Sequence, residues 1–168
     1  MESNSTVNWL QKTGASVLFI GYLPASGTFA SAAVVAGLWF CSAKLAAMHI
    51  TTGSTAFWLL TMAVICISMV LSSRSRELFG KEDSGRIVID EVAGQLITFL
   101  FIPLTLRTLV LGFVLFRFFD IIKPWPVFCM EELEGGVGVT MDDVAAGILA
   151  NISILVILFA YQAIRSYL

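Results

Sequence analysis

The feature that most constrains this chain is a set of long stretches without a single charged residue. Residues 13–43, 54–72 and 144–164 carry no Asp, Glu, Lys or Arg. A helix of about 20 apolar residues crosses the hydrocarbon core of a bilayer. Apolar residues make up 58% of the 168 residues and charged residues only 13%, whereas a typical soluble domain has about 25% charged residues. Because a small soluble fold needs polar side chains over its large surface, the sequence predicts an integral membrane protein.

The segmental hydropathy predicts an all-α fold, a polytopic membrane helix bundle in a single domain covering residues 1–168. We expect about four to five short transmembrane helices and an N-terminal interfacial helix. Gly and Pro residues interrupt the apolar runs and mark their ends. The expected interfacial helix covers residues 7–20, and the expected spans cover residues 28–46, 54–72, 87 to about 105, 107–122 and 142–164.

The distribution of Lys and Arg over the loops predicts the orientation, because cytoplasmic loops are enriched in these residues. One side of the bundle holds seven of them, and the other side holds three. We therefore assign the first side to the cytoplasm. The net charge of −2 provides no basic surface for a nucleic acid. The first set is Lys12, Arg74, Arg76, Lys81, Arg86, Arg117 and Lys123, and the second is Lys44, Arg107 and Arg165.

The acidic residues of the expected helices all fall at this cytoplasmic face. An acidic residue at a helix start is often only a cap that interacts favourably with the helix dipole. Asp90 follows residues that already read as helical, and Asp120 ends a helix, where the dipole disfavours an anion. Ionisable residues at a membrane boundary are candidates for function. The candidates are Asp90, Glu91, Asp120, Asp142 and Asp143.

Such a cluster of carboxylates needs cations, and oxygen ligands without His or Cys favour Mg²⁺ or Ca²⁺. Mg²⁺ is usually held by one or two carboxylates together with phosphate oxygens. Lys123 and Arg117 are then candidate phosphate ligands, with cytoplasmic anchoring as their alternative role. Gly135 and Gly136 either let backbone N–H groups approach an anion or form a flexible loop. Thr28 either caps its helix or marks a phosphate site at the helix N-terminus.

Other phosphoryl-transfer chemistries lack their residues. His49 is the only histidine and lies in an expected loop on the opposite side. Cys129 has no Arg six residues later, so the loop of cysteine phosphatases is absent. No Asp-x-Asp-x-Thr motif for an aspartyl-phosphate enzyme occurs. Metal-assisted attack by water remains.

Four segments carry motifs in a fixed order: Leu-Pro-Ala-Ser-Gly-Thr in 23–31, Ile-Asp-Glu in 87–94, Arg-x-x-Asp-x-x-Lys-Pro-x-Pro in 116–126, and Gly-Gly-x-Gly-x-x-x-Asp-Asp in 135–147. Together they resemble the phosphatidylglycerophosphatase A family of bacterial membrane enzymes. Two positions depart from the family pattern, because the family usually has Pro at Ser26 and Gly at Ala30. Asp83 matches an acidic position that tends to precede the Asp-Glu motif.

The resemblance implies Mg²⁺-dependent hydrolysis of phosphatidylglycerophosphate to phosphatidylglycerol and phosphate. It places a multi-pass enzyme in the bacterial inner membrane, among membrane lipids, with its active site facing the cytoplasm. The oligomeric state stays open. The resemblance implies catalytic roles for Asp90, Glu91, Asp120, Asp142 and Asp143, with Asp90, Glu91, Asp120 and Asp143 as metal ligands. The implied phosphate-binding residues are Lys123, Arg117, Thr28, Gly135 and Gly136, with Asp83 as an additional acidic residue.

The main alternative is a carboxylate-lined small ion transporter or channel. That function needs acidic residues near the bilayer midplane or on both faces. The centres of residues 54–72 and 144–164 are uncharged, and Asn151 is the only strongly polar residue deep in the last helix. A purely structural membrane protein would leave Asp120 unexplained. The sequence therefore favours the enzyme.

Overall fold

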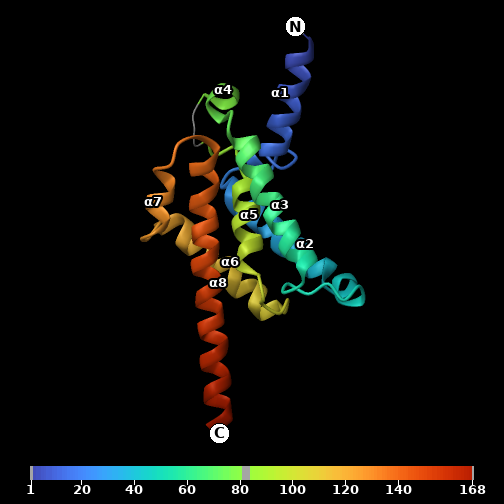
Figure 1. Cartoon of the computed structure of the whole chain (residues 1–168), viewed down its shortest axis with the longest axis vertical. Coiled ribbons are helices and arrows are strands. Elements are labelled where there is room, and N and C mark those ends of the chain that lie inside the picture. Colours follow the sequence, from blue (N-terminus) through green and yellow to red (C-terminus); the bar gives the residue numbers. More distant parts are fainter. Residues whose placement is uncertain (1, 81–83, 168) are drawn as a thin grey trace.

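The computed structural model describes residues 2–80 and 84–167, so Asp83 lies outside the described residues. Every regular element in these ranges is helical, which confirms the predicted all-α membrane helix bundle (Figure 1). The elements are α1 (Glu2–Ala15), η1 (Ile20–Tyr22), α2 (Ser26–Ala47), α3 (Thr55–Ser72), α4 (Ser75–Phe79), α5 (Ile89–Thr98), α6 (Leu106–Ile122), α7 (Val127–Glu131) and α8 (Gly135–Tyr167).

Among the described residues, three helices, α2, α3 and α8, are long and apolar enough to cross a membrane by length and composition. α8 has 33 residues and extends past the other helices toward the C-terminus, at the opposite end of the molecule from the N-terminus (Figure 1). α5 and α6 are shorter, with 10 and 17 residues. They form a hairpin that packs against α8 and α2.

The expected helix from residue 87 to about 105 is shorter than predicted, because α5 ends at Thr98. Residues 99–101 form a turn and residues 102–105 are irregular, and side chains from other parts of the protein bond to the backbone here. The Asn151 side-chain amide donates to the carbonyls of Thr98 (3.0 Å) and Leu100 (2.7 Å), and the Thr52 hydroxyl donates to the Ile102 carbonyl (2.7 Å). Irregular backbone is tolerated at membrane depth only inside the protein. Asn151, deep in α8, thus has a structural role.

The last helix begins earlier than expected, at Gly135 instead of Asp142, and the expected loop 123–141 also contains α7. Glycine favours loops because it weakens helices, which made the Gly-rich segment look non-helical. In the structure Gly136 lies against α3, where a side chain would collide with the backbone of Met69 and Ser73. A side chain at Gly138 would collide with the Leu133 carbonyl. The glycines therefore serve close packing at the start of α8.

The N-terminal helix is also displaced relative to the prediction of residues 7–20. α1 ends at Ala15 because Val17, Leu18 and Phe19 have positive φ angles of 43°, 54° and 72°. Non-glycine residues rarely adopt this left-handed conformation, and a right-handed helix cannot continue through it. The chain thereby turns through η1 into α2.

A close crossing of α5 and α8 determines how Asp90 on α5 and Asp143 on α8 are aligned. A side chain at Gly147 would collide with the Gly94 carbonyl, and one at Gly94 would collide with the Asp143 carbonyl and the Phe116 ring. Asp90 and Asp143 each precede one of these glycines by four residues, which is about one helical turn, or roughly 6 Å. The absence of side chains at the crossing therefore brings the two acidic residues to the same level.

Candidate active site

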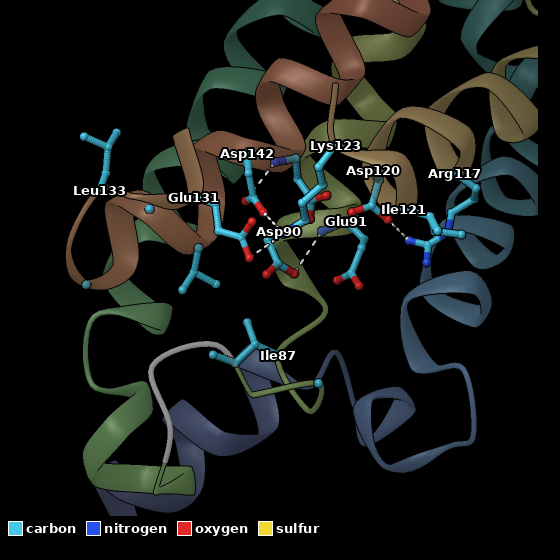
Figure 2. A pocket seen from close by; sticks show the side chains of 15 residues that line it. Ile87, Asp90, Glu91, Arg117, Asp120, Ile121, Lys123, Glu131, Leu133 and Asp142 are labelled. Atoms are coloured by element: carbon cyan, nitrogen blue, oxygen red, sulfur yellow. Dashed lines mark hydrogen bonds and ion pairs between the residues drawn. The ribbon is translucent and has the colours of Figure 1, made fainter. Parts of the chain in front are cut away.

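A cavity of about 540 Å³ lies where the first turns of α5 and α8 meet the last turn of α6. Ligand sites typically have volumes of about 300–1,000 Å³. Figure 2 shows acidic side chains converging on this cavity from all three helices. The structure thus brings together every predicted acidic residue within the described ranges. The charged residues that line the cavity are Asp90, Glu91, Arg117, Asp120, Lys123, Glu131, Asp142 and Asp143.

Three carboxylates in this cavity form a compact group. Asp90, Glu91 and Asp143 each offer an oxygen, and these oxygens lie within 4.8 Å of one another. Asp90 and Asp143 are only 6% and 4% exposed. Asp90 accepts a hydrogen bond from the Glu91 backbone N–H (2.9 Å), and Asp142 accepts one from the Asp143 backbone N–H (2.9 Å). Each pair of adjacent acidic residues is thus oriented by its own backbone.

Within residues 2–80 and 84–167, two carboxylates of the group have a buried oxygen without a hydrogen-bond partner, and these atoms are Glu91 Oε2 and Asp143 Oδ1. Leaving buried carboxylate oxygens without a partner is costly. The donor set is oxygen only, which suits a hard cation such as Mg²⁺.

The two basic residues of the cavity are paired with the other carboxylates. The Arg117 guanidinium lies 2.5 Å from Asp120, and both side chains are largely buried. Lys123 Nζ donates to Asp142 Oδ2 and lies at the same distance, 2.9 Å, from Glu131 Oε1. Burial acts to lower the pKa of Lys123, but these two acidic partners outweigh it and raise that pKa.

Asp120 was expected among the metal ligands, and in the structure it lies beside the three-carboxylate group rather than within it. Its position at the end of α6 is still unfavourable for an anion, as predicted, because the C-terminal dipole is negative. The Arg117 side chain, one helical turn earlier, compensates for that charge.

The predicted phosphate-binding residues fall in different places. Arg117, Lys123 and Gly135 line the cavity, whereas Gly136 faces α3 and Thr28 is not among the lining residues. The Gly-rich segment is therefore the first turn of a helix and not a loop around an anion. Of its glycines, Gly135 and Gly138 line the cavity.

Sequence reasoning missed two residues, Gly27 and Glu131. A side chain at Gly27 would collide with the Glu91 carboxylate and contact the Arg117 guanidinium, so glycine lets the start of α2 lie against both side chains without displacing them. Its signal was its place inside the Ser-Gly-Thr motif. Glu131 contacts Lys123 from α7, a helix of five residues that no pattern in the sequence predicts.

Comparison with known proteins connects this geometry to a family. The family profile for phosphatidylglycerophosphatase A matches residues 13–158. Phosphatidylglycerophosphatase A of Haemophilus influenzae is 34% identical over 142 residues, covering 83% of this chain and 80% of that protein. The Escherichia coli protein of the same name is 36% identical over 94 residues, covering 55% of each chain.

A third relative carries another name. A putative phosphatidylinositol-3-phosphatase of Bacteroides thetaiotaomicron is 47% identical over 78 residues, 45% of this chain and 49% of that protein. No solved structure matches. The family profile covers residues on both sides of all four motifs, including each acidic residue of the cavity. The chain therefore belongs to the phosphatidylglycerophosphatase A family, a family of lipid phosphomonoester hydrolases.

Proposed function

We propose that this protein hydrolyses the phosphate monoester of phosphatidylglycerophosphate, using Mg²⁺, at the cytoplasmic face of a bacterial inner membrane. Family membership supports the reaction. The observation that carries the proposal is the group of three carboxylates in one cavity with Arg117 and Lys123, in which Glu91 Oε2 and Asp143 Oδ1 are buried without a partner among the described residues.

Asp90, Glu91 and Asp143 are the residues that would hold the metal. Their oxygens are close enough to share one cation, and two of the three carboxylates have an oxygen without a hydrogen-bond partner in the described chain. When bound there, Mg²⁺ would offset the clustered charge and polarise a phosphoryl oxygen.

Arg117 and Lys123 would bind the phosphate. Arg117 offers a planar set of N–H donors and Lys123 a compact charge. Asp120 and Asp142 hold these long side chains against the cavity wall, at 2.5 and 2.9 Å. The substrate therefore meets basic groups that are already placed, which lowers the entropic cost of binding it in a reactive geometry.

The helix directions also favour an anionic headgroup. α2, α5 and α8 all begin at the end of the bundle that holds the cavity, as the residues that approach one another show: Gly27 with Glu91, and Asp143 with Gly94. Helix N-termini carry partial positive charge and free N–H groups. The Lys and Arg distribution supports a cytoplasmic position for this end, where a lipid headgroup would meet the cavity while its acyl chains stay in the bilayer.

The test is phosphate release by the purified protein from vesicles containing phosphatidylglycerophosphate or phosphatidic acid. We expect turnover with Mg²⁺ and none in excess chelator, because the carboxylate group needs a cation. Thermal unfolding is a measurement independent of activity, and in it Mg²⁺ should raise the melting temperature of the unmodified protein but not that of Asp143→Asn. Full turnover in excess chelator would remove the metal from the proposal, although not the family assignment.

A further inference from the structure

An apolar groove lies between α2 and α6, on the outer surface of the bundle. It encloses about 280 Å³, and its walls include Ala32, Ala36 and Phe40 from α2 and Leu106, Val110 and Phe113 from α6. Phe40, Leu106 and Val110 are 79%, 60% and 53% exposed, so the groove opens to the surroundings. Its floor is formed by the fully buried Leu109.

The spacing of residues along both helices places the groove in line with the candidate active site. On α6, Arg117 follows Phe113 by four residues, which places both on one face of the helix. On α2, Thr28 precedes Ala32 by the same spacing, and the adjacent Gly27 approaches Arg117 and Glu91. The two helices run in opposite directions, since α2 begins and α6 ends at the site. The distance along the axis of α6 from Arg117, at the site, to Leu106, at the far end of the groove, is about 17 Å.

The shape and chemistry of this surface select an amphiphile. Its site end holds a guanidinium and a lysine, and its remainder is lined by aliphatic and aromatic side chains. Ala32 and Ala36 create the hollow, because their small side chains stand between larger ones on the same helix face. A helix long and apolar enough to cross a membrane, α2, supplies one wall, so the groove faces acyl chains.

We propose that this groove binds one acyl chain of the lipid substrate while the phosphate occupies the cavity between Arg117 and Lys123. The inference rests on the proposed function, since it takes the ligand to be a lipid phosphomonoester. Burial of each methylene group in the groove adds to binding, so the groove fixes where the head group enters the site. The enzyme thus selects its substrate by its chain as well as by its phosphate.

The first experiment fills the groove with Ala36→Trp and compares two substrates in mixed micelles, a long-chain and a dihexanoyl phosphatidic acid. We expect KM for the long-chain lipid to rise about tenfold with kcat nearly unchanged, because binding shared by ground and transition states is lost. KM for the short-chain lipid should stay the same. Val156→Trp is the matched control, because Val156 is 61% exposed on α8 outside the groove.

Three results would overturn the proposal. One is an unchanged KM for the long-chain lipid. Another is an equal loss for both substrates, which would indicate a general disturbance of the site. The third is the chain-dependent effect with Gly37→Leu instead, because Gly37 lines a different groove between α2, α3 and α5 and has open space at its Cβ position.

A binding measurement separates this proposal from the proposed function. Trp39 lines the groove, so phosphatidic acid with a brominated chain should quench its fluorescence more than phosphatidylcholine with the same chain. Trp39→Phe should remove that difference. If quenching shows no head-group preference, the groove proposal fails even where turnover is normal. If quenching is stronger with phosphatidic acid but no lipid phosphate is hydrolysed, the proposed function fails and the proposal that the groove binds an acyl chain is supported.

Discussion

Replacement of Asn151 by Leu tests the structural role of the one strongly polar side chain deep in α8. Its amide donates two hydrogen bonds, to the carbonyls of Thr98 and Leu100, where α5 has ended and the chain turns. Leucine has a similar size but no donor. Both carbonyls would then stay inside the protein without these partners, at a depth where water cannot replace them.

The expected cost follows from the two lost bonds. A buried polar group left unsatisfied costs about 1–3 kcal/mol, so two carbonyls give an upper range of roughly 2–6 kcal/mol. Side-chain hydrogen bonds measured inside a membrane protein average only about 0.6 kcal/mol. We therefore expect a loss near the lower limit, about 2 kcal/mol of unfolding free energy. Asn151 lies eight residues beyond Asp143, about 12 Å along α8, so turnover of the folded variant should change little.

Equilibrium unfolding in detergent micelles measures this loss, with turnover below the transition as the second reading. Ser153→Ala is the matched control, because the Ser153 hydroxyl donates to the Leu149 carbonyl of its own helix and so does not tie α8 to α5. It should cost much less than Asn151→Leu. An Asn151→Leu protein as stable as the unmodified one would refute the reasoning that the end of α5 is held from α8.

Two further predictions concern the site and its orientation. Asp120→Asn should fold but lower turnover about a hundredfold, roughly 2.7 kcal/mol of transition-state stabilisation, because Arg117 loses the partner that places it. The effects of Asp120→Asn and Glu91→Gln on turnover should be far from additive if both residues serve one site. Near-native turnover of Asp120→Asn at saturating Mg²⁺ would exclude Asp120 from the site. Single cysteines at Ser84 and Gly135, in a background without native cysteines, should resist an impermeant thiol reagent in intact cells, whereas one at Arg107 should react; labelling at position 84 or 135 would contradict the cytoplasmic orientation.

The sequence was informative where one physical rule dominated. Residues 54–72 form α3 almost as predicted, because an uncharged apolar run at bilayer length has few alternatives. The convergence of Asp90, Asp120 and Asp143 also followed from the sequence, since the Lys and Arg distribution placed the parts of the helices that carry them on one side. The confirmed all-α bundle follows from the apolar runs.

The rest depended on contacts between distant segments, which the sequence does not display. Gly135 and Gly136 read as a loop because glycine weakens a helix in isolation, whereas packing against α3 decides their conformation. The turn after Thr98 was missed because it needs Asn151, more than fifty residues away. The pairing of Arg117 with Asp120 separated one expected metal ligand from the others, a choice that depends on side-chain geometry.

Two glycines of α8 have a mechanical consequence for the site. Gly136 lies against the backbone at the end of α3, and Gly147 lies against the Gly94 carbonyl of α5. Asp143 stands between these two close contacts, about 10 Å from Gly136 and about 6 Å from Gly147 along the helix. The part of α8 that carries the carboxylates is therefore held on both sides, whereas its C-terminal end extends past the other helices (Figure 1). A tilt of that far end with a change in bilayer thickness should thus move the carboxylates little.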